Sequence, residues 1–247
     1  MLTRASRRGV AGAGSSRRGT DALEFALIAP LLLIFIIGVY DTSKAMLLYQ
    51  QVYNAAHTVT ISASNVSEQA DGSTSLTVEE VQQVLSAIYA EMPLVAAGVE
   101  KGTRSATLTS VTFVPNPPTC VPSGSTVCAM VANTAWSVPY NDGNAAGFGA
   151  VARPCGTLNQ ATPTAIAQGS LTSLPTANVV NPGPILVADV HYRYTPVFFS
   201  FVTGAIDFWA SSYWPVRSTS TTNPSAPAYT QYDLANEAGG AGKCNGF

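Results

Sequence analysis

Few side chains in this 247-residue sequence could carry out acid–base catalysis. Asp189 and Asp207 fall on neighbouring predicted strands, where paired carboxylates can act as acid and base; solvated strand faces also carry such pairs routinely. His57 falls on a predicted helix, and His191 is expected on the outward face of a strand, so we interpret both as surface residues. No G-x-S-x-G nucleophile motif is present, and we expect a protein that is not an enzyme.

The cysteines offer oxidative chemistry instead, and they are Cys120, Cys128, Cys155 and Cys244. Outside the cytoplasm such residues can form disulfides. Cys120 and Cys128 flank turn residues between two predicted strands, which favours a local bridge and leaves Cys155 for Cys244. Four cysteines allow three pairings, and the sequence alone does not choose among them. Without a C-x-x-C motif or a histidine cluster, disulfides are favoured over a metal site, and we expect no cofactor.

The third chemical feature is one glutamate inside an apolar run. Residues 22–40 contain nineteen positions, and Glu24 is the only charged one. As a helix the run would be roughly 28 Å long, which matches the hydrocarbon core of a membrane. An acid in such a place costs about 2–3 kcal/mol, and less near an interface. Glu24 therefore needs either the positive end of the helix dipole, near which acids are favoured, or a partner cation.

The charges around this run predict a single-span topology. Five arginines and no acid occur in the first 18 residues, at Arg4, Arg7, Arg8, Arg17 and Arg18. The positive-inside rule puts the N-terminus in the cytoplasm and residues 41–247 on the other side of the membrane. Beyond the leader, seven basic residues face fourteen acidic ones. An acidic body without a basic patch argues against nucleic-acid binding.

The residues around Glu24 resemble a known family. A basic leader, a glycine, four further residues, a Glu-Phe pair and an apolar run together resemble the type IV prepilin pattern. The fuller string is similar to the TadE-like proteins, which are minor pseudopilins of the tight-adherence (Flp) type IVb pilus system of bacteria. The resemblance is strongest over residues 18–60. It rests on Gly19, Glu24, Phe25, Pro30, Gly38 and Asp41.

The resemblance implies how Glu24 obtains its cation. A prepilin peptidase on the cytoplasmic face of the inner membrane would cut after Gly19, and Thr20 would carry the new α-ammonium group. Glu24, then the fifth residue of the mature chain, would neutralise it within one helix or between packed helices. Glu24 and Phe25 would act in processing and assembly. The implied partners are the membrane, the prepilin peptidase, major and other minor pilins or pseudopilins, and the pilus assembly platform proteins.

Other interpretations of the N-terminus stay open. Residues 43–45, Ser-Lys-Ala, have the small-x-small pattern that signal peptidase prefers, and a cut there would release a soluble domain starting at Met46. Ser-Arg-Arg occurs at 6–8 and at 16–18, as in twin-arginine export signals, but the long apolar run argues against that route. The run could also remain as an uncut signal anchor.

Two helices are predicted in the first 92 residues. The first continues beyond the membrane through residues 42–62, where apolar residues recur at helical spacing; Pro30 inside it removes a backbone hydrogen bond and can kink the axis. The second begins at the N-cap Thr77, which forms a capping box with Glu80, and ends at Pro93. Its apolar stripe is expected to be core and consists of Val78, Val81, Leu85, Ile88 and Met92.

The rest of the chain predicts an antiparallel sheet. Four segments have strand-like patterns, and they are residues 104–114, 126–138, 185–194 and 206–217. Their alternation indicates a sheet with one face on a core, covered by the two helices, so the expected fold class is α+β and pilin-like. The expected organisation is a basic leader (1–19), a transmembrane helix (20–41) and an extracytoplasmic domain (42–247), which contains a loop-rich surface insertion (139–184) and a flexible tail (218–247).

Three phenylalanines follow the third of these strands, and they are Phe198, Phe199 and Phe201. Exposed together, they would form an apolar patch for a partner or a membrane; we expect burial or contact with the membrane-proximal helix. The sequence thus predicts a single-pass component of pilus assembly, for which a role in adhesion at the pilus tip is also compatible. The alternative is an anchored or secreted binding or adhesin domain unrelated to pili. A weaker alternative is an envelope enzyme built on Asp189 and Asp207.

Overall fold

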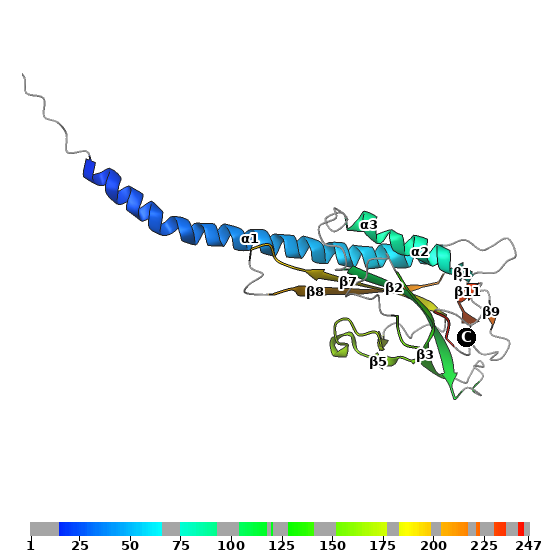
Figure 1. Cartoon of the computed structure of the whole chain (residues 1–247). Coiled ribbons are helices and arrows are strands. Elements are labelled where there is room, and N and C mark those ends of the chain that lie inside the picture. The colour runs from blue at the N-terminus through cyan, green and yellow to red at the C-terminus, as the bar shows by residue number, and fades with distance from the viewer. Residues whose placement is uncertain are drawn as a thin grey trace, which may run out of the picture.

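The computed structural model describes residues 15–65, 75–92, 104–117, 120, 128–140, 152–176, 183–198, 204–216, 221–222, 230–235 and 242–244. Its longest element is α1 (Ser15–Ser64), a helix of 50 residues, which at 1.5 Å per residue is about 75 Å long. Figure 1 shows that the N-terminal half of α1 projects away from the rest of the protein, whereas the C-terminal half lies along a sheet. The predicted continuation of the helix past the apolar run is confirmed.

The C-terminal half of α1 packs because one of its sides is apolar. The buried residues recur three or four positions apart, as one side of a helix requires, and they are Leu48, Val52, Ala55, Ala56, Val59 and Ala63. They lie on the strands β7 (Ile185–Tyr194) and β8 (Ile206–Pro215). One buried polar contact fixes the position of the helix, because the hydroxyl oxygens of Thr60 and Ser212 lie 2.8 Å apart.

The second predicted helix is present but divided. α2 (Val78–Ser86) and α3 (Ile88–Glu91) are separated by a turn at Ala87. The capping box is confirmed: the Glu80 N–H donates to the Thr77 hydroxyl at 3.2 Å, and the Thr77 N–H donates to the Glu80 carboxylate at 2.8 Å. Four residues of the predicted stripe are buried and Val78 packs against them, so the stripe is core, as expected. Pro93, the predicted end, lies outside the described residues.

The central sheet has five strands in the order β4-β3-β2-β7-β8, and all neighbours are antiparallel. Its remaining strands are β2 (Arg104–Asn116), β3 (Ala129–Pro139) and the two-residue β4 (Gly156–Thr157). Three small pairings surround it: β1 (Ser75–Thr77) with β11 (Asp233–Ala235), β5 (Asn159–Ala161) with β6 (Ser173–Pro175), and β9 (Thr221–Thr222) with β10 (Thr230–Gln231). A short 3-10 helix, η1 (Pro163–Ala165), lies between β5 and β6. The predicted α+β class with an antiparallel sheet is confirmed.

The sheet is covered on both faces, whereas the sequence predicted a core on one face only. The first core joins α1, α2 and α3 to alternate residues of the strands, such as Leu108 and Leu186. The second core joins the intervening residues, such as Phe113 and Val187, to Leu158 and Leu174. Leu158 and Leu174 belong to residues 152–176, part of the stretch that we expected to be a loop-rich insertion. The sequence of residues 152–176 shows little alternation of apolar and polar residues, because its strands β4, β5 and β6 have only two or three residues each.

Two disulfides cross-link the domain, one between cysteines close in sequence and one between cysteines far apart in sequence. Cys120 is bonded to Cys128, and Cys155 to Cys244, which is the pairing that the sequence favoured. The second bond ties the cover of the second face to the C-terminal segment, where the Cys244 N–H also donates to the carbonyl of Ala135 in β3 at 2.9 Å. The domain therefore closes its second core with a covalent link across 89 positions.

Candidate functional site: the long helix with Glu24 and Asp41

The projecting half of α1 has the surface of a membrane span. Among the described residues, one helix is long and apolar enough to cross a membrane, the part of α1 from Asp21 to Ser64, and its most apolar stretch has no buried portion. Phe25 is 73% exposed and Leu31 73%. An apolar surface of this size is not stable in water and marks contact with lipid or protein. This half of α1 is therefore suited to anchor the chain in a membrane.

The predicted processing and assembly residues lie near the N-terminal end of α1. The backbone of Gly19 and Thr20 is already part of α1. Glu24 follows Thr20 by four positions, so the two occupy one side of the helix on successive turns. Glu24 is exposed and makes no hydrogen bond or ion pair with any side chain that the structure describes. None of the described side chains therefore supplies a cation to this carboxylate.

Pro30 lies inside α1, and the helix continues through it. The residue is exposed, like its apolar neighbours. A proline there leaves one carbonyl without its helical hydrogen bond, which membrane helices tolerate when neighbouring groups compensate. In Figure 1 the projecting half of α1 is gently bent, as is compatible with a weakened turn.

Asp41 lies at the other end of the apolar run and has entirely different surroundings. Asp41 is only 6% exposed. Its two carboxylate oxygens accept the backbone N–H groups of Val197 at 3.3 Å and Phe198 at 3.1 Å, two successive residues after β7. The Phe198 ring also packs edge-on against Tyr40, with 6.1 Å between the ring centroids. Asp41 therefore fixes the segment after β7 to α1 where the apolar run ends.

The sequence predicts only part of the arrangement around Asp41. The family pattern includes Asp41, but no sequence pattern predicts that its carboxylate binds the segment after β7. The signals present in the sequence are an acid, Asp41, directly after the apolar run 22–40, and a segment without charged residues at 195–205. Of the three phenylalanines, Phe198 contacts α1 and is 48% exposed. Phe199 and Phe201 lie outside the described residues.

The carboxylates considered for catalysis do not converge. The strand register places Asp189 opposite Ser211, and Asp207 opposite Arg193. Asp189 is buried and forms a two-pronged ion pair with Arg153, with N···O distances of 2.7 and 2.9 Å. Asp207 forms a similar pair with Arg193 at 2.8 and 3.0 Å. Each carboxylate is neutralised by its own arginine, which does not favour a pair that shares a proton.

His191 is not the surface residue that we predicted, because it is only 2% exposed. The second face of the sheet, on which it lies, is covered, and its ring stacks on Trp209 with 3.7 Å between centroids. Its Nε2 lies 3.1 Å from the Asp207 carboxylate. Burial lowers the pKa of His191, and Asp207 opposes this shift in part. The hydrogen bond from Arg193 lowers the pKa of Asp207.

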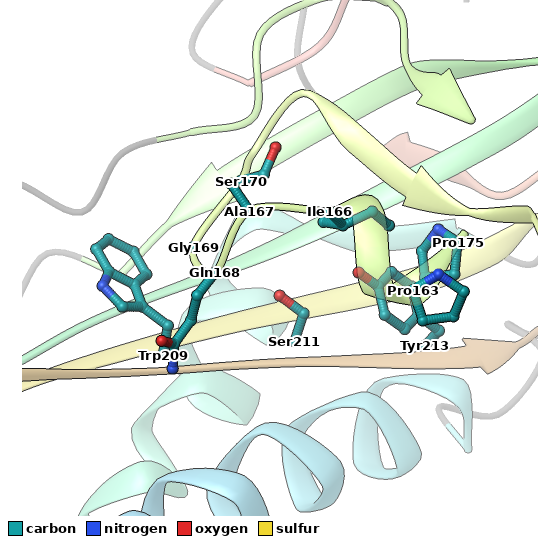
Figure 2. Close-up of a pocket in the computed structure, with 10 residues that line it drawn as sticks. All are labelled: Pro163, Ile166, Ala167, Gln168, Gly169, Ser170, Pro175, Trp209, Ser211 and Tyr213. Carbon is teal, nitrogen blue, oxygen red and sulfur yellow. The ribbon is translucent and has the colours of Figure 1, made fainter. Parts of the chain in front are cut away.

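A hollow of about 180 Å³ lies on this second face, between Trp209 and Tyr213 of β8 and residues 163–175 (Figure 2). Trp209 is not free to bind a ring-shaped ligand, because His191 stacks on it and Gly169 approaches closely. With φ of +75°, Gly169 is so near that an added Cβ would lie 2.6 Å from the indole. Burial raises the pKa of Tyr213, and the Ser211 hydroxyl donates to the Asp189 carboxylate at 2.6 Å. The polar floor of the hollow is thus engaged in the Arg153–Asp189 network.

The parts of the chain that the structure describes contain no group of three or more His, Cys, Asp or Glu side chains that could hold a metal ion. The chemical features that remain are Glu24, the only charged residue of the apolar run 22–40, and the buried Asp41 directly after that run. Both lie in the first quarter of the chain.

Comparison with known proteins supports this emphasis on α1. Residues 19–60 match a protein-family model described as "TadE: TadE-like protein". The match spans 42 of the 247 residues and includes Glu24 and Asp41. A search of curated proteins and a search of solved structures each found no match. The resemblance seen in the residues is thus confirmed: residues 19–60 are a TadE-like segment, which points to a component associated with a Tad pilus.

Proposed function

We propose that the protein is a minor pseudopilin-like structural and assembly component of a bacterial Flp (tight-adherence) pilus, with no enzymatic activity of its own. The observation that carries the proposal is the exposed, apolar, projecting half of α1 with Glu24 as its lone internal acid. A plain membrane anchor has no use for that acid. A helix that must select and pack against other helices does, because a charge in an apolar setting is stable only with a partner.

The proposed partner of Glu24 is an α-ammonium group. A prepilin peptidase cuts after Gly19, and Thr20 becomes the first residue of the mature chain. The ammonium of Thr20 then lies one helical turn from Glu24 in the same chain and also faces helices packed beside it. A pairing of this kind offsets the cost of about 2–3 kcal/mol for an acid near the membrane and sets the register between neighbouring helices. Major pilins and other minor pilins or pseudopilins supply those helices.

The proposed location is the bacterial inner membrane, with the N-terminus in the cytoplasm and the sheet domain in the periplasm. The excess of arginine before the apolar run supports this orientation. The two disulfides support an oxidising compartment for the domain. The helix would enter the pilus or its base with the domain still attached, and the assembly platform proteins would act on the cytoplasmic side.

The first test is the N-terminus of the protein in bacterial membranes, with and without a prepilin peptidase. We expect a chain that begins at Thr20 only when the peptidase is present, as measured by intact mass and N-terminal sequencing. Gly19→Asp should remain uncut, whereas Gly14→Asp, which adds the same charge to the leader away from the cut, should be processed. A chain that begins at Met46, or one that stays uncut in both strains, would contradict the proposal and favour an anchored or secreted binding domain unrelated to pili.

A further inference from the structure

The segment after β7 reaches α1 at the height where the apolar run ends. Asp41 lies directly after that run, and its carboxylate accepts the N–H groups of Val197 and Phe198. The two backbone donors bind the two oxygens of one carboxylate at 3.3 and 3.1 Å, and hydrogen bonds to an ionised acceptor are stronger than those between neutral groups. Because Asp41 is buried, losing these donors would reduce the compensation of its charge. The segment is therefore held firmly at one level of the helix.

The side chains at this level face outward and are apolar. We define the apolar tip as Tyr40, Val197 and Phe198, which are 52%, 53% and 48% exposed. The Tyr40 and Phe198 rings contact each other edge-on, so the tip is one continuous surface drawn from two parts of the chain. The sequence from 195 to 205, TPVFFSFVTGA, carries no charged residue. Nothing in the composition of this segment opposes contact with an apolar medium.

The position of the tip selects its partner. Tyr40 is the last residue of the apolar run 22–40, so the tip is continuous with the surface that contacts the membrane interior. Tyrosine and tryptophan are enriched at this level, where their rings lie among lipid headgroups, and Tyr40 is such a residue. The remainder of α1, from Tyr40 to Ser64, extends about 36 Å farther from the membrane. A protein partner that approaches from the side away from the membrane would contact this part of α1 before it reached the apolar tip.

We infer that the apolar tip inserts into the headgroup region of the periplasmic leaflet and that Asp41 holds it there. This inference rests on the proposed function in one respect, that the apolar half of α1 spans the membrane. It adds a second, shallow membrane contact, made by the sheet domain itself. With a span and a tip both fixed to lipid, the domain has a defined tilt relative to the membrane before any assembly begins.

The test uses the full chain in vesicles of phosphatidylethanolamine and phosphatidylglycerol, with a fluorescent label on one added cysteine. All four native cysteines are paired in disulfides, so labelling under oxidising conditions is selective. Val197→Cys places the label on the tip and leaves the Phe198 ring in place. Asn65→Cys is the matched control at the exposed far end of α1, and Leu32→Cys reports the span. Quenchers are lipids with a nitroxide near the headgroup, lipids with a nitroxide deep in the acyl chain, and a water-soluble nitroxide.

We expect the label at 197 to emit at shorter wavelength in vesicles and to be quenched by the headgroup nitroxide. The label at 65 should be quenched only from water, and the label at 32 only from the acyl chain. Adding Asp41→Ala to Val197→Cys should reduce quenching by the headgroup nitroxide, and Asp41→Asn, which keeps one acceptor oxygen, should reduce it less.

Three outcomes would overturn the inference, and they are distinguishable. Quenching at 197 only from water would place the tip in solution. A label at 197 that neither lipid nor aqueous nitroxides reach would show that protein covers the tip. In both cases a normal signal at 32 would leave the proposed anchoring intact. A label at 32 that the acyl-chain nitroxide does not quench would remove the membrane span, and with it both proposals.

Discussion

Glu24 and Asp41 are carboxylates on the same helix, about 25 Å apart along its axis, and their surroundings are opposite. Glu24 is exposed among apolar side chains and has no partner among the side chains described. Asp41 is buried and accepts two backbone N–H groups from the segment after β7. The partner of Asp41 is part of the fold, whereas the partner proposed for Glu24 is supplied by processing or by another helix.

The acids of the sheet domain resemble Asp41 in this respect. Asp189 has Arg153, Asp207 has Arg193, and Asp233 has Lys243 at 2.6 Å. Each of these cations is brought in by folding, from another strand or segment. Among the described residues, these three acids of the domain thus have cations supplied by the fold, whereas Glu24 in the projecting half of α1 has none.

The largest expected effect is on assembly. Glu24→Gln keeps the size of the side chain and removes its charge, so we expect loss of the protein from assembled pili and of pilus yield that depends on it. Export, membrane insertion and the stability of the sheet domain should not change, because the core begins at Leu48, far along α1. Pilus yield and crosslinking to pilins measure the effect. Glu79→Gln, which alters an exposed acid in α2, is the control and should assemble normally. Normal assembly of Glu24→Gln would end the distinction between the two carboxylates.

The next largest effect concerns a carboxylate with a partner built into the fold. Asp189→Ala leaves the Arg153 guanidinium buried without its counter-charge, which costs about 3–5 kcal/mol of the free energy of unfolding. Urea unfolding followed by tryptophan fluorescence measures this loss. Arg193→Ala is the matched control on the same face, because it breaks the exposed ion pair with Asp207 and leaves the contact of Asp207 with His191 in place; its loss should be much smaller because exposed ion pairs contribute little. Equal losses in the two variants would show that burial does not decide the strength of these pairs.

The sequence predicted those elements that depend on neighbouring residues. The capping box of Thr77 and Glu80 is a contact across three positions, and the strands at 185–194 and 206–215 show their alternation directly. The same alternation predicted that Asp189 and His191 lie on a solvated face of the sheet, and this prediction is wrong because both are buried. A polar residue on a strand is normally exposed, and no local signal shows that Arg153, Trp209 and Gly169 will cover that face.

The same distinction between local and distant contacts applies to the two carboxylates of the candidate site. Glu24 was identified because its anomaly is local, a charge inside an apolar run. The role of Asp41 was missed because its hydrogen-bond donors lie 156 and 157 positions away. Pairings at such separations depend on the docking of α1 on β7 and β8, which a single sequence does not encode in any short pattern.

A smaller, local effect sharpens the comparison at Asp41 itself. Asp41→Ala removes two hydrogen bonds to a charged group, and we expect a loss of about 1.5–3 kcal/mol, confined largely to the segment after β7. Hydrogen exchange measured by mass spectrometry should show faster exchange at the amides of Val197 and Phe198. Asp21→Ala, an exposed acid in the same helix, should leave that exchange unchanged. Protection that persists in Asp41→Ala would mean that the segment is held by its apolar contacts rather than by the carboxylate.

The smallest effect is a pH dependence within the domain. Burial lowers the pKa of His191, so the folded protein keeps this residue neutral below its ordinary pKa of about 6.5, where the unfolded chain takes up a proton. Stability therefore falls as the pH falls through that value. The lowered pKa of Asp207 adds a separate loss at lower pH, below the ordinary carboxyl range.

Unfolding of the wild type and of His191→Gln across this pH range measures the difference. Glutamine does not titrate, so the variant should show a flatter profile between neutral and mildly acidic pH, even if it is less stable throughout. The Asp207-dependent loss at lower pH should remain in both proteins. An identical slope near the ordinary histidine pKa would show that the folded protein binds the proton as readily as the unfolded chain. In that case Asp207 would compensate fully for burial, and the histidine would belong with the carboxylates whose partners are complete.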